Sequence, residues 1–315
     1  MLPSFVEPLG DGLYAIDTGF ERDQFDAAYL VVERGHAAFI DTGTNLAVPR
    51  LLAALHAVGV TRDDVDWVIP THVHLDHAGG VGLLMQSLPR ARVAVHPRGA
   101  RHMVDPSALY AGASAVYGPA EMARLYGMPV IVAPERIVTT HDGMVLTLSE
   151  RPLECVHTPG HALHHHCVWE ARTRTWFTGD TFGLSYPELV NAQGRWITPT
   201  AAPVQFDPQP LKTSVSRLLE RDPAALCVTH YGRVPRAPHL GPLLLSQIDQ
   251  LAEIGERLRS ADDRHARLRD ALRTMYRERL TAHGFTDVDH ALLLLAMDVE
   301  LNAQGLACWL DRATR

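Results

Sequence analysis

Short apolar runs bounded by turn-forming residues dominate the first two thirds of the chain. The runs at 13–17, 27–35 and 37–43 have the length and composition of β-strands. The Glu-Arg-Gly sequence at 33–35 predicts a hairpin turn between the last two. The chain is therefore expected to open with an antiparallel meander.

A helical pattern follows this meander. Asn45 is predicted as the N-cap of this helix, and Pro49 suits its first turn. Apolar residues recur with the helical period up to Gly59, where the helix is expected to stop. Two apolar strands are predicted next, at 65–71 and 91–97. Alternation of strand and helix is typical of a layered α/β domain.

The pattern loosens between 98 and 129, where short helical pieces mix with glycine and proline. We interpret this segment as a candidate lid over a cleft; the alternative, which we favour for each single tyrosine, is a surface excursion packed by its own aromatics. A second set of strands is predicted at 135–149, 153–160 and 164–180, followed by a helix beginning near Asp207. Two strand-rich halves in similar order predict two facing sheets with helices outside.

The last part of the chain changes to long helical periodicity, after prolines and glycines at 229–242 mark a boundary. Helix is predicted through 247–284, and again from 286 to a stop at Gly305. We divide the chain into a catalytic domain, 1–235, and a helical subdomain, 236–315. Acids alternate with arginines in this tail, which favours solvated faces, packing or a homodimer over a nucleic-acid surface.

Composition narrows the class of protein. The 315 residues are 46% hydrophobic, enough to bury a core, and the formal net charge is -7. This charge argues against binding nucleic acid or anionic lipid through the overall field, so we expect a soluble small-molecule partner. The four cysteines are widely spaced with no CxxC pair, which indicates neither a disulfide framework nor a thiolate zinc site.

The hydrophobic pattern predicts neither a signal peptide nor a membrane-spanning helix. The start, MLPSFVEPLGDGLYAID, has no basic region followed by an apolar one, and no apolar run approaches the roughly 20 residues that span a bilayer. We therefore expect a cytoplasmic protein that does not bind membranes.

The sequence THVHLDHAGG, 71–80, gathers metal-binding side chains: His72, His74, Asp76 and His77. Imidazole and carboxylate groups are ligands that suit a divalent transition metal. Three later motifs also place a ligand-type side chain where a predicted strand gives way to a loop, a common location for functional residues. They are HTPGH with His161, FTGD with Asp180 and CVTHYG with His230.

In this order, the four motifs resemble those of the metallo-β-lactamase fold superfamily of hydrolases, in particular its glyoxalase II-like and lactonase-like branch. The resemblance covers about residues 10 to 235. It implies an αββα sandwich, here followed by the helical subdomain. The helical tail is similar to the C-terminal helices of glyoxalase II, but no glutathione-binding residues match there.

The resemblance also implies a ligand set for two divalent metal ions, with zinc expected first and manganese or iron as alternatives. Asp41, in FIDTG, would support this site from behind the ligands. The run His164, His165 and His166 receives no ligand role. The ligands of the first ion would be His72, His74 and His161, those of the second Asp76, His77 and His230, with Asp180 bridging both.

Such a site predicts a hydrolase in which a bridging hydroxide attacks the carbonyl of an ester, lactone or thioester. Asp76 and Asp180 are the candidate catalytic residues, and Asp76 would orient the hydroxide and shuttle a proton. Tyr186 and Tyr231 follow metal-ligand motifs and are candidates for substrate contact, although a buried structural tyrosine is at least as common. A carboxylic ester or lactone is slightly preferred, because no basic phosphate clamp accompanies the motifs.

Three alternatives remain open. A mononuclear iron persulfide dioxygenase uses similar motifs, since two histidines and a carboxylate suit oxygen chemistry. A phosphodiesterase or RNA-processing hydrolase would share the ligand set but would need a basic surface. A metal-stabilised interaction protein is the weakest alternative, because structural zinc sites are usually closed by four ligands.

Overall fold

The computed structural model describes residues 1–235 and 239–312, which form two compact units. The predicted domain boundary touches residues 236–238, which lie outside the described residues. Beyond 235, the described chain belongs to the second unit, and this unit also takes in two earlier stretches. The first unit comprises Met1–His157, His164–Gly179 and Pro223–Pro235, and the second adds Thr158–Leu163 and Asp180–Asp222 to the described tail.

A seven-stranded mixed sheet in the first unit follows the chain order, β1 to β7. Its strands are antiparallel up to β4 and parallel from β4 onward. β7 comes from the segment that we assigned to the second set of strands, and this assignment is wrong because β7 pairs with β6. The strands are β1 Val6–Gly10, β2 Leu13–Asp17, β3 Ala27–Glu33, β4 His36–Ile40, β5 Val65–Ile69, β6 Arg92–Val95 and β7 Ile137–Thr139.

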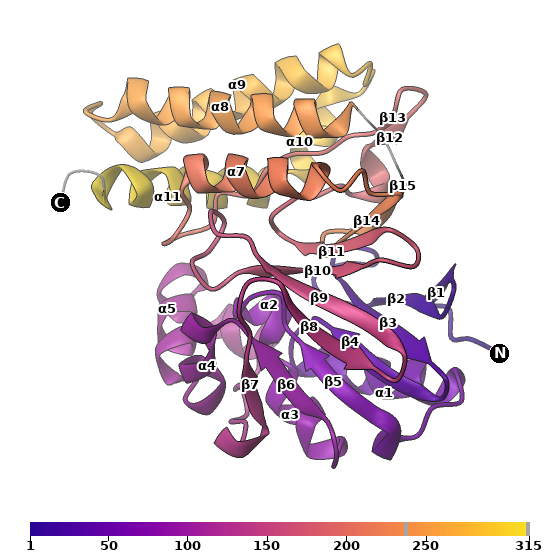
Figure 1. Cartoon of the computed structure of the whole chain (residues 1–315). Coiled ribbons are helices and arrows are strands. Elements are labelled where there is room, and N and C mark those ends of the chain that lie inside the picture. Colours follow the sequence, from indigo (N-terminus) through magenta and orange to yellow (C-terminus); the bar gives the residue numbers. More distant parts are fainter. Residues whose placement is uncertain (236–238, 313–315) are drawn as a thin grey trace. The chain divides into compact units, whose positions relative to one another are not determined.

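Helices cover one face of this sheet (Figure 1). Leu51 and Leu55 on the first long helix and Leu84 on a later one pack into a core against strand residues such as Phe39. Parallel strands require such crossovers, which explains why the helices lie between β4 and β7 in the chain. The elements are η1 Asn45–Ala47, α1 Val48–Ala57, η2 Arg62–Asp64, α2 Leu75–Ala78, α3 Val81–Ser87 and α4 Pro97–Val104.

The predicted N-cap at Asn45 is wrong, because α1 begins only at Val48, after the 3₁₀ turn η1, and it is η1 that a side chain caps. Thr44 has an extended backbone, and its hydroxyl accepts a hydrogen bond from the Leu46 amide at 3.3 Å. Asn45 already belongs to the first turn, and its side chain donates to the Met128 carbonyl instead. Threonine and asparagine both cap helices, so the sequence alone does not decide between neighbours.

The segment that follows α4 is mostly helical, and its first helix, α5, is not buried in the core. The structure describes all of α5, and none of its residues is buried. Tyr117 and Tyr126 have ring centroids 5.7 Å apart, and Tyr126 also packs edge-on against Phe20 at 5.3 Å. These contacts agree with a surface excursion packed by its own aromatics, whereas a lid role stays a prediction. The elements are α5 Ser107–Tyr117, α6 Pro119–Glu121, the π-helix η3 Met122–Tyr126 and the 3₁₀ helix η4 Pro134–Arg136.

A second, six-stranded sheet completes the first unit, with the order β15-β14-β11-β10-β9-β8. Only the β11–β14 pair is parallel among the described strands of this sheet. Side chains of both sheets, including Tyr29, Ile40, Val168 and Phe177, share one buried core. The two facing sheets are therefore present. The strands are β8 Met144–Leu148, β9 Arg151–His157, β10 His166–Glu170, β11 Thr175–Gly179, β14 Ala225–Val228 and β15 Gly232–Pro235.

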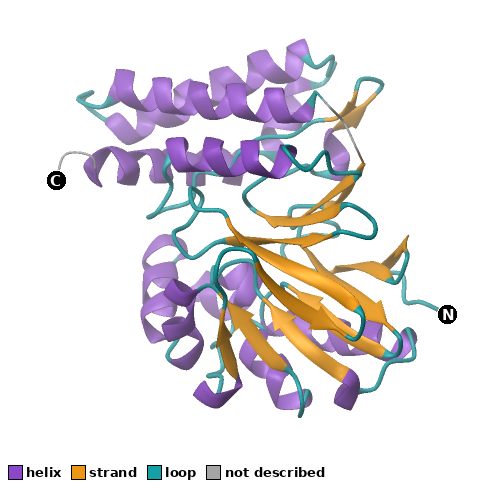
Figure 2. Cartoon of the chain, viewed as in Figure 1, coloured by secondary structure: helices purple, strands orange, loops and turns teal. Residues whose placement is uncertain are grey.

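The second unit is mainly helical (Figure 2). The helix expected near Asp207 is α7, and the Asp207 carboxylate accepts a capping hydrogen bond from the Gln209 amide. Among the described residues, no single helix is long and apolar enough to cross a bilayer; α10 and α11 together pass that test but are bent by 61°. The elements are η5 Pro187–Leu189, β12 Val190–Asn191, β13 Gly194–Arg195, α7 Pro208–Leu219, α8 Leu240–Leu258, α9 Arg264–Ala282, α10 Val288–Leu294 and α11 Ala296–Arg312.

The predicted helix stop at Gly305 is wrong, because α11 continues through it to Arg312. A Cβ at Gly305 would lie 1.6 Å from the Ala201 carbonyl oxygen, so this glycine permits close packing. Nearby, the buried Asn302 side chain accepts from the Ala201 amide and donates to the Tyr276 hydroxyl at 2.6 Å. The C-terminal helices thus hold the loop around Ala201 in place.

Candidate metal centre

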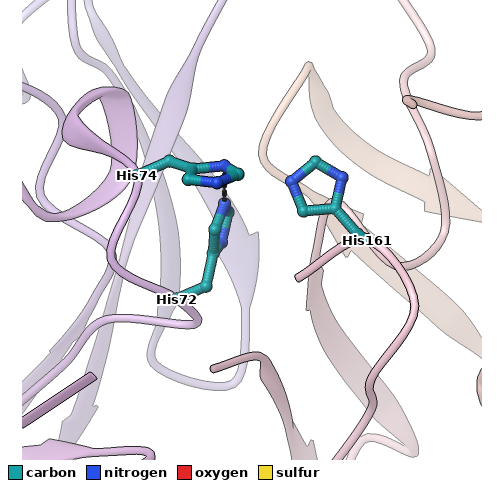
Figure 3. Close-up of side chains that lie close together, drawn as sticks. All are labelled: His72, His74 and His161. Atoms are coloured by element: carbon teal, nitrogen blue, oxygen red, sulfur yellow. Dashed lines mark hydrogen bonds between the residues drawn. The ribbon is translucent and has the colours of Figure 1, made fainter. Parts of the chain in front are cut away.

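The segment after β5 presents the first histidines. β5 ends at Ile69, and the chain runs through His72 and His74 before the short helix α2 begins at Leu75. His72 Nδ1 lies 3.2 Å from the Thr71 hydroxyl, and His72 Nε2 lies 2.8 Å from His74 Nδ1. Figure 3 shows this contact between His72 and His74 as a dashed line, together with His161. The two facing nitrogens are suited to binding one ion.

Three side chains of the first unit converge in a second group: Asp76, His77 and His230. Asp76 Oδ2 lies 3.6 Å from His77 Nε2 and 3.5 Å from His230 Nε2. These separations are long for hydrogen bonds. Two ligand atoms that bind one tetrahedral ion with bonds of about 2.0 Å are expected to lie about 3.3 Å apart, and the observed distances are close to this value. This donor set fits a divalent metal.

The imidazole rings of His77 and His230 are each held by a contact at Nδ1, the nitrogen that does not face Asp76. His77 Nδ1 lies 2.9 Å from Asp41 Oδ2, and His230 Nδ1 lies 3.2 Å from the Phe25 carbonyl oxygen. An acceptor at Nδ1 holds the proton there, which leaves the Nε2 lone pair for a metal. The hydrogen bonds therefore select the tautomer that binds metal.

Asp41 connects three segments behind the ligands. Its carboxylate accepts from the Thr71 amide at 2.7 Å, from the Thr229 hydroxyl at 2.9 Å and from His77. Asp41 also has a φ of 55°, in the left-handed region that costs a non-glycine residue roughly 1 kcal/mol or more. Its position is the one expected for a residue that supports the ligands, and that role stays a prediction.

Within the second unit, His161 Nε2 and Asp180 Oδ2 lie 3.3 Å apart. The Thr200 hydroxyl contacts His161 Nδ1 at 2.9 Å, so this ring too is held at Nδ1 while Nε2 faces a carboxylate. Gly160 directly before it has a φ of 133°, and a Cβ there would lie 2.2 Å from the Leu211 amide nitrogen. Only glycine fits at this point of the loop.

The two tyrosines predicted to contact substrate are buried. Tyr186 is 1% exposed, and its hydroxyl donates to Asp298 at 3.3 Å. Tyr231 is 5% exposed and belongs to the core between the two sheets of the first unit. These contacts are typical of structural tyrosines, and the substrate role stays a prediction for both.

Sequence reasoning missed Asp26, a buried carboxylate that follows Phe25. Its Oδ2 accepts from the Thr18 hydroxyl at 2.9 Å. Burial raises the pKa of Asp26 to about 7, although the positive charges that His230 and His77 can carry oppose this shift. A single aspartate at the start of a predicted strand carries no signal of its own, so only the fold reveals it.

Comparison with known proteins identifies the family. The family model described as the metallo-beta-lactamase superfamily matches residues 22–230, more than half of the chain. The chain belongs to the metallo-beta-lactamase superfamily. The matched range contains every proposed metal ligand.

Relatives found by sequence similarity are distant. An uncharacterized protein, YobT of Bacillus subtilis, is 26% identical over 67% of this chain and 84% of its own length. The acyl-coenzyme A thioesterase MBLAC2 of Bos taurus is 26% identical over 55% of this chain and 64% of its own length. These matches do not show to which branch of the superfamily the chain belongs, so the glyoxalase II-like or lactonase-like branch stays a prediction.

The fold is shared over nearly the whole chain. A metallo-beta-lactamase superfamily protein from Sulfolobus tokodaii matches with a TM-score of 0.66 at 22% identity, covering 94% of this chain and 98% of that one. The predicted metallo-beta-lactamase sandwich with C-terminal helices is therefore confirmed.

Proposed function

We propose that this superfamily member is a metal-dependent hydrolase of small-molecule esters or thioesters. The observation that carries the proposal is the convergence of Asp76 Oδ2 with the Nε2 atoms of His77 and His230, each ring being anchored through Nδ1. The similarity to an acyl-coenzyme A thioesterase moves thioesters ahead of the lactones and esters that the sequence slightly favoured.

Each of the two ligand sets shows the donor chemistry of a metal site. When bound, divalent ions would supply Lewis acidity for the carbonyl oxygen and lower the pKa of water. Zinc is our first expectation, with manganese or iron as alternatives. The residues that would hold them are His72, His74 and His161 for one ion, Asp76, His77 and His230 for the other, with Asp180 shared.

Asp76 is suited to moving a proton. Its side chain is 23% exposed, whereas that of His77 is fully buried, so Asp76 has more direct access to substrate and water than His77. Hydrolysis forms a bond between a water oxygen and the acyl carbon and breaks the bond from that carbon to sulfur or oxygen. We propose that the Asp76 carboxylate accepts the water proton and delivers it to the leaving sulfur or oxygen.

Substitution of His77 tests the proposal. In His77→Ala, we expect the turnover of an acyl thioester to fall at least about 100-fold and the metal content to drop, because one of three convergent ligand atoms is lost. His56→Ala, at an exposed histidine of α1, is the matched control and should change neither. Full turnover and full metal content in His77→Ala would contradict the proposal.

A further inference from the structure

The second unit contains a cavity of about 520 Å³ where the start of α7 approaches the last turn of α11. This volume lies within the range of small-molecule pockets, roughly 300 to 1,000 Å³. Leu163, Val204 and Pro210 line it, together with Cys308 of α11. Most of the wall is therefore apolar.

Two of the apolar side chains remain exposed although they border the cavity. Leu163 is 44% exposed and Val204 is 60% exposed. Burying both against a ligand would remove this apolar surface from water, which stabilises a complex. The cavity therefore favours an apolar occupant.

Contacts within the protein already use polar groups around the cavity. The Gln205 side-chain oxygen accepts from the Leu163 amide at 2.7 Å, and Arg312 donates to the Phe206 carbonyl. Asp311 pairs with Arg264 at 2.8 Å. Asp311 and Arg312 both line the cavity, so the side chains around it do not favour one sign of ligand charge.

Two residues that line the cavity are close in sequence to a proposed metal ligand. Gly160 and Leu163 both line it, and His161 lies between them. Two residues span at most about 7 Å, so the backbone of Leu163, which lines the cavity, lies within that distance of the His161 backbone. A substrate whose carbonyl lies near His161 can place an attached chain in the cavity.

We propose that this cavity binds the acyl chain of the substrate and makes the enzyme selective for medium-length chains. About eight to ten carbons would fill half of the space, since a group the size of water occupies roughly 30 Å³. This inference rests on the proposed hydrolase function, and it adds the substrate class.

Cys308 allows binding to be measured without catalysis. Of the four cysteines, all described, Cys155, Cys167 and Cys227 are buried and Cys308 is half-buried. In the protein as purified, octanoate should slow alkylation of Cys308 by iodoacetamide at least about fivefold, and acetate at equal ionic strength should not. Equal alkylation rates in octanoate and acetate would overturn the proposal.

A variant checks that protection arises in this cavity. Val204→Trp should fill the entrance, so octanoate should no longer slow alkylation of Cys308. Leu293→Trp places the same side chain at a residue of α10 that is 73% exposed and does not line the cavity. Protection should persist in Leu293→Trp, and its equal loss in both variants would contradict the assignment.

Hydrolysis of an acyl thioester series separates this inference from the proposed function. We expect kcat/KM to rise about fourfold per added methylene up to about eight carbons, and this rise to disappear in Val204→Trp. Hydrolysis with no dependence on chain length would refute the cavity assignment and leave the hydrolase intact. Cys308 protection without hydrolysis of any thioester would support the cavity and refute the proposed function.

Discussion

At the scale of single residues, the metal ligands depend on groups that hold their rings. Asp41 reaches the Thr71 backbone, His77 Nδ1 and the Thr229 hydroxyl with one carboxylate. We therefore expect Asp41 to contribute to metal affinity, because it would fix the tautomer and the angle of a ring that would bind the ion through the opposite nitrogen.

Asp41→Ala should weaken metal binding about 10- to 100-fold, because His77 loses the acceptor for its Nδ1 proton. Competition with a chromogenic chelator measures this. Asp66→Ala is the matched control, since Asp66 contacts the Nδ1 of another histidine, the partly exposed His36, at 3.1 Å. Unchanged affinity in Asp41→Ala, or an equal loss in Asp66→Ala, would show that Asp41 does not act through His77.

A separate group of histidines should make stability depend on pH. Burial and neighbouring histidines lower the pKa of His166 to about 3, and burial lowers the pKa of His96 to about 4. Their unfolded pKa is about 6.5, so the unfolded chain binds protons that the folded chain excludes. Their contribution to stability is complete above about pH 6.5 and is lost as pH falls toward the folded values.

At pH 5, His166 alone should reduce the free energy of unfolding of the metal-free protein by roughly 2 kcal/mol relative to pH 7.5. Urea unfolding at several pH values measures this loss. His166→Gln should show a smaller loss over the same interval, because glutamine does not titrate. The same pH dependence in both proteins would contradict this assignment.

The sequence alone predicted residues that stand together in motifs, such as His72 and His77. It was not sufficient for their partners. The Phe25 carbonyl that orients His230 is 205 positions away, and a backbone oxygen has no residue type by which to recognise it. Asp26 was missed for the same reason, since its surroundings arise from folding.

At the scale of elements, strands and helices followed the hydrophobic pattern. Errors occurred where tertiary packing determined the end of a helix or the partner of a strand. Gly305 has the sequence signature of a helix stop, but it serves the contact between α11 and Ala201. β7 was assigned to the wrong sheet because strand pairing is set by contacts that periodicity does not encode. Local pattern thus predicts that an element exists more reliably than it predicts where the element packs.

Gly160 allows this dependence on packing to be tested. Gly160→Ala combines an unfavourable φ with a Cβ that meets the α7 backbone, so it should destabilise the protein by about 2 kcal/mol or more. Gly112→Ala, in α5 with nothing within 4 Å of the new Cβ, should instead stabilise it by up to about 1 kcal/mol. Denaturant unfolding distinguishes the two, and similar effects of both substitutions would contradict the account.

At the scale of the whole molecule, the sandwich and the helical tail were predictable, but the composition of the two units was not. The second unit includes Thr158–Leu163 and Asp180–Asp222 as well as the tail. Side chains of the tail explain this: Asn302 and Gln247 hydrogen-bond to backbone groups of the segment around Ile197 and Ala201. Such long-range hydrogen bonds leave no periodic trace in the sequence.

The central claim is that this chain binds two divalent metal ions as a hydrolase. The most direct measurement is elemental analysis of freshly purified protein, with the number of each metal per chain determined. The account predicts close to two ions of zinc or manganese per chain. No bound metal, even after incubation with zinc or manganese and removal of excess, would contradict it. A single iron per chain would also contradict it and would favour the dioxygenase alternative.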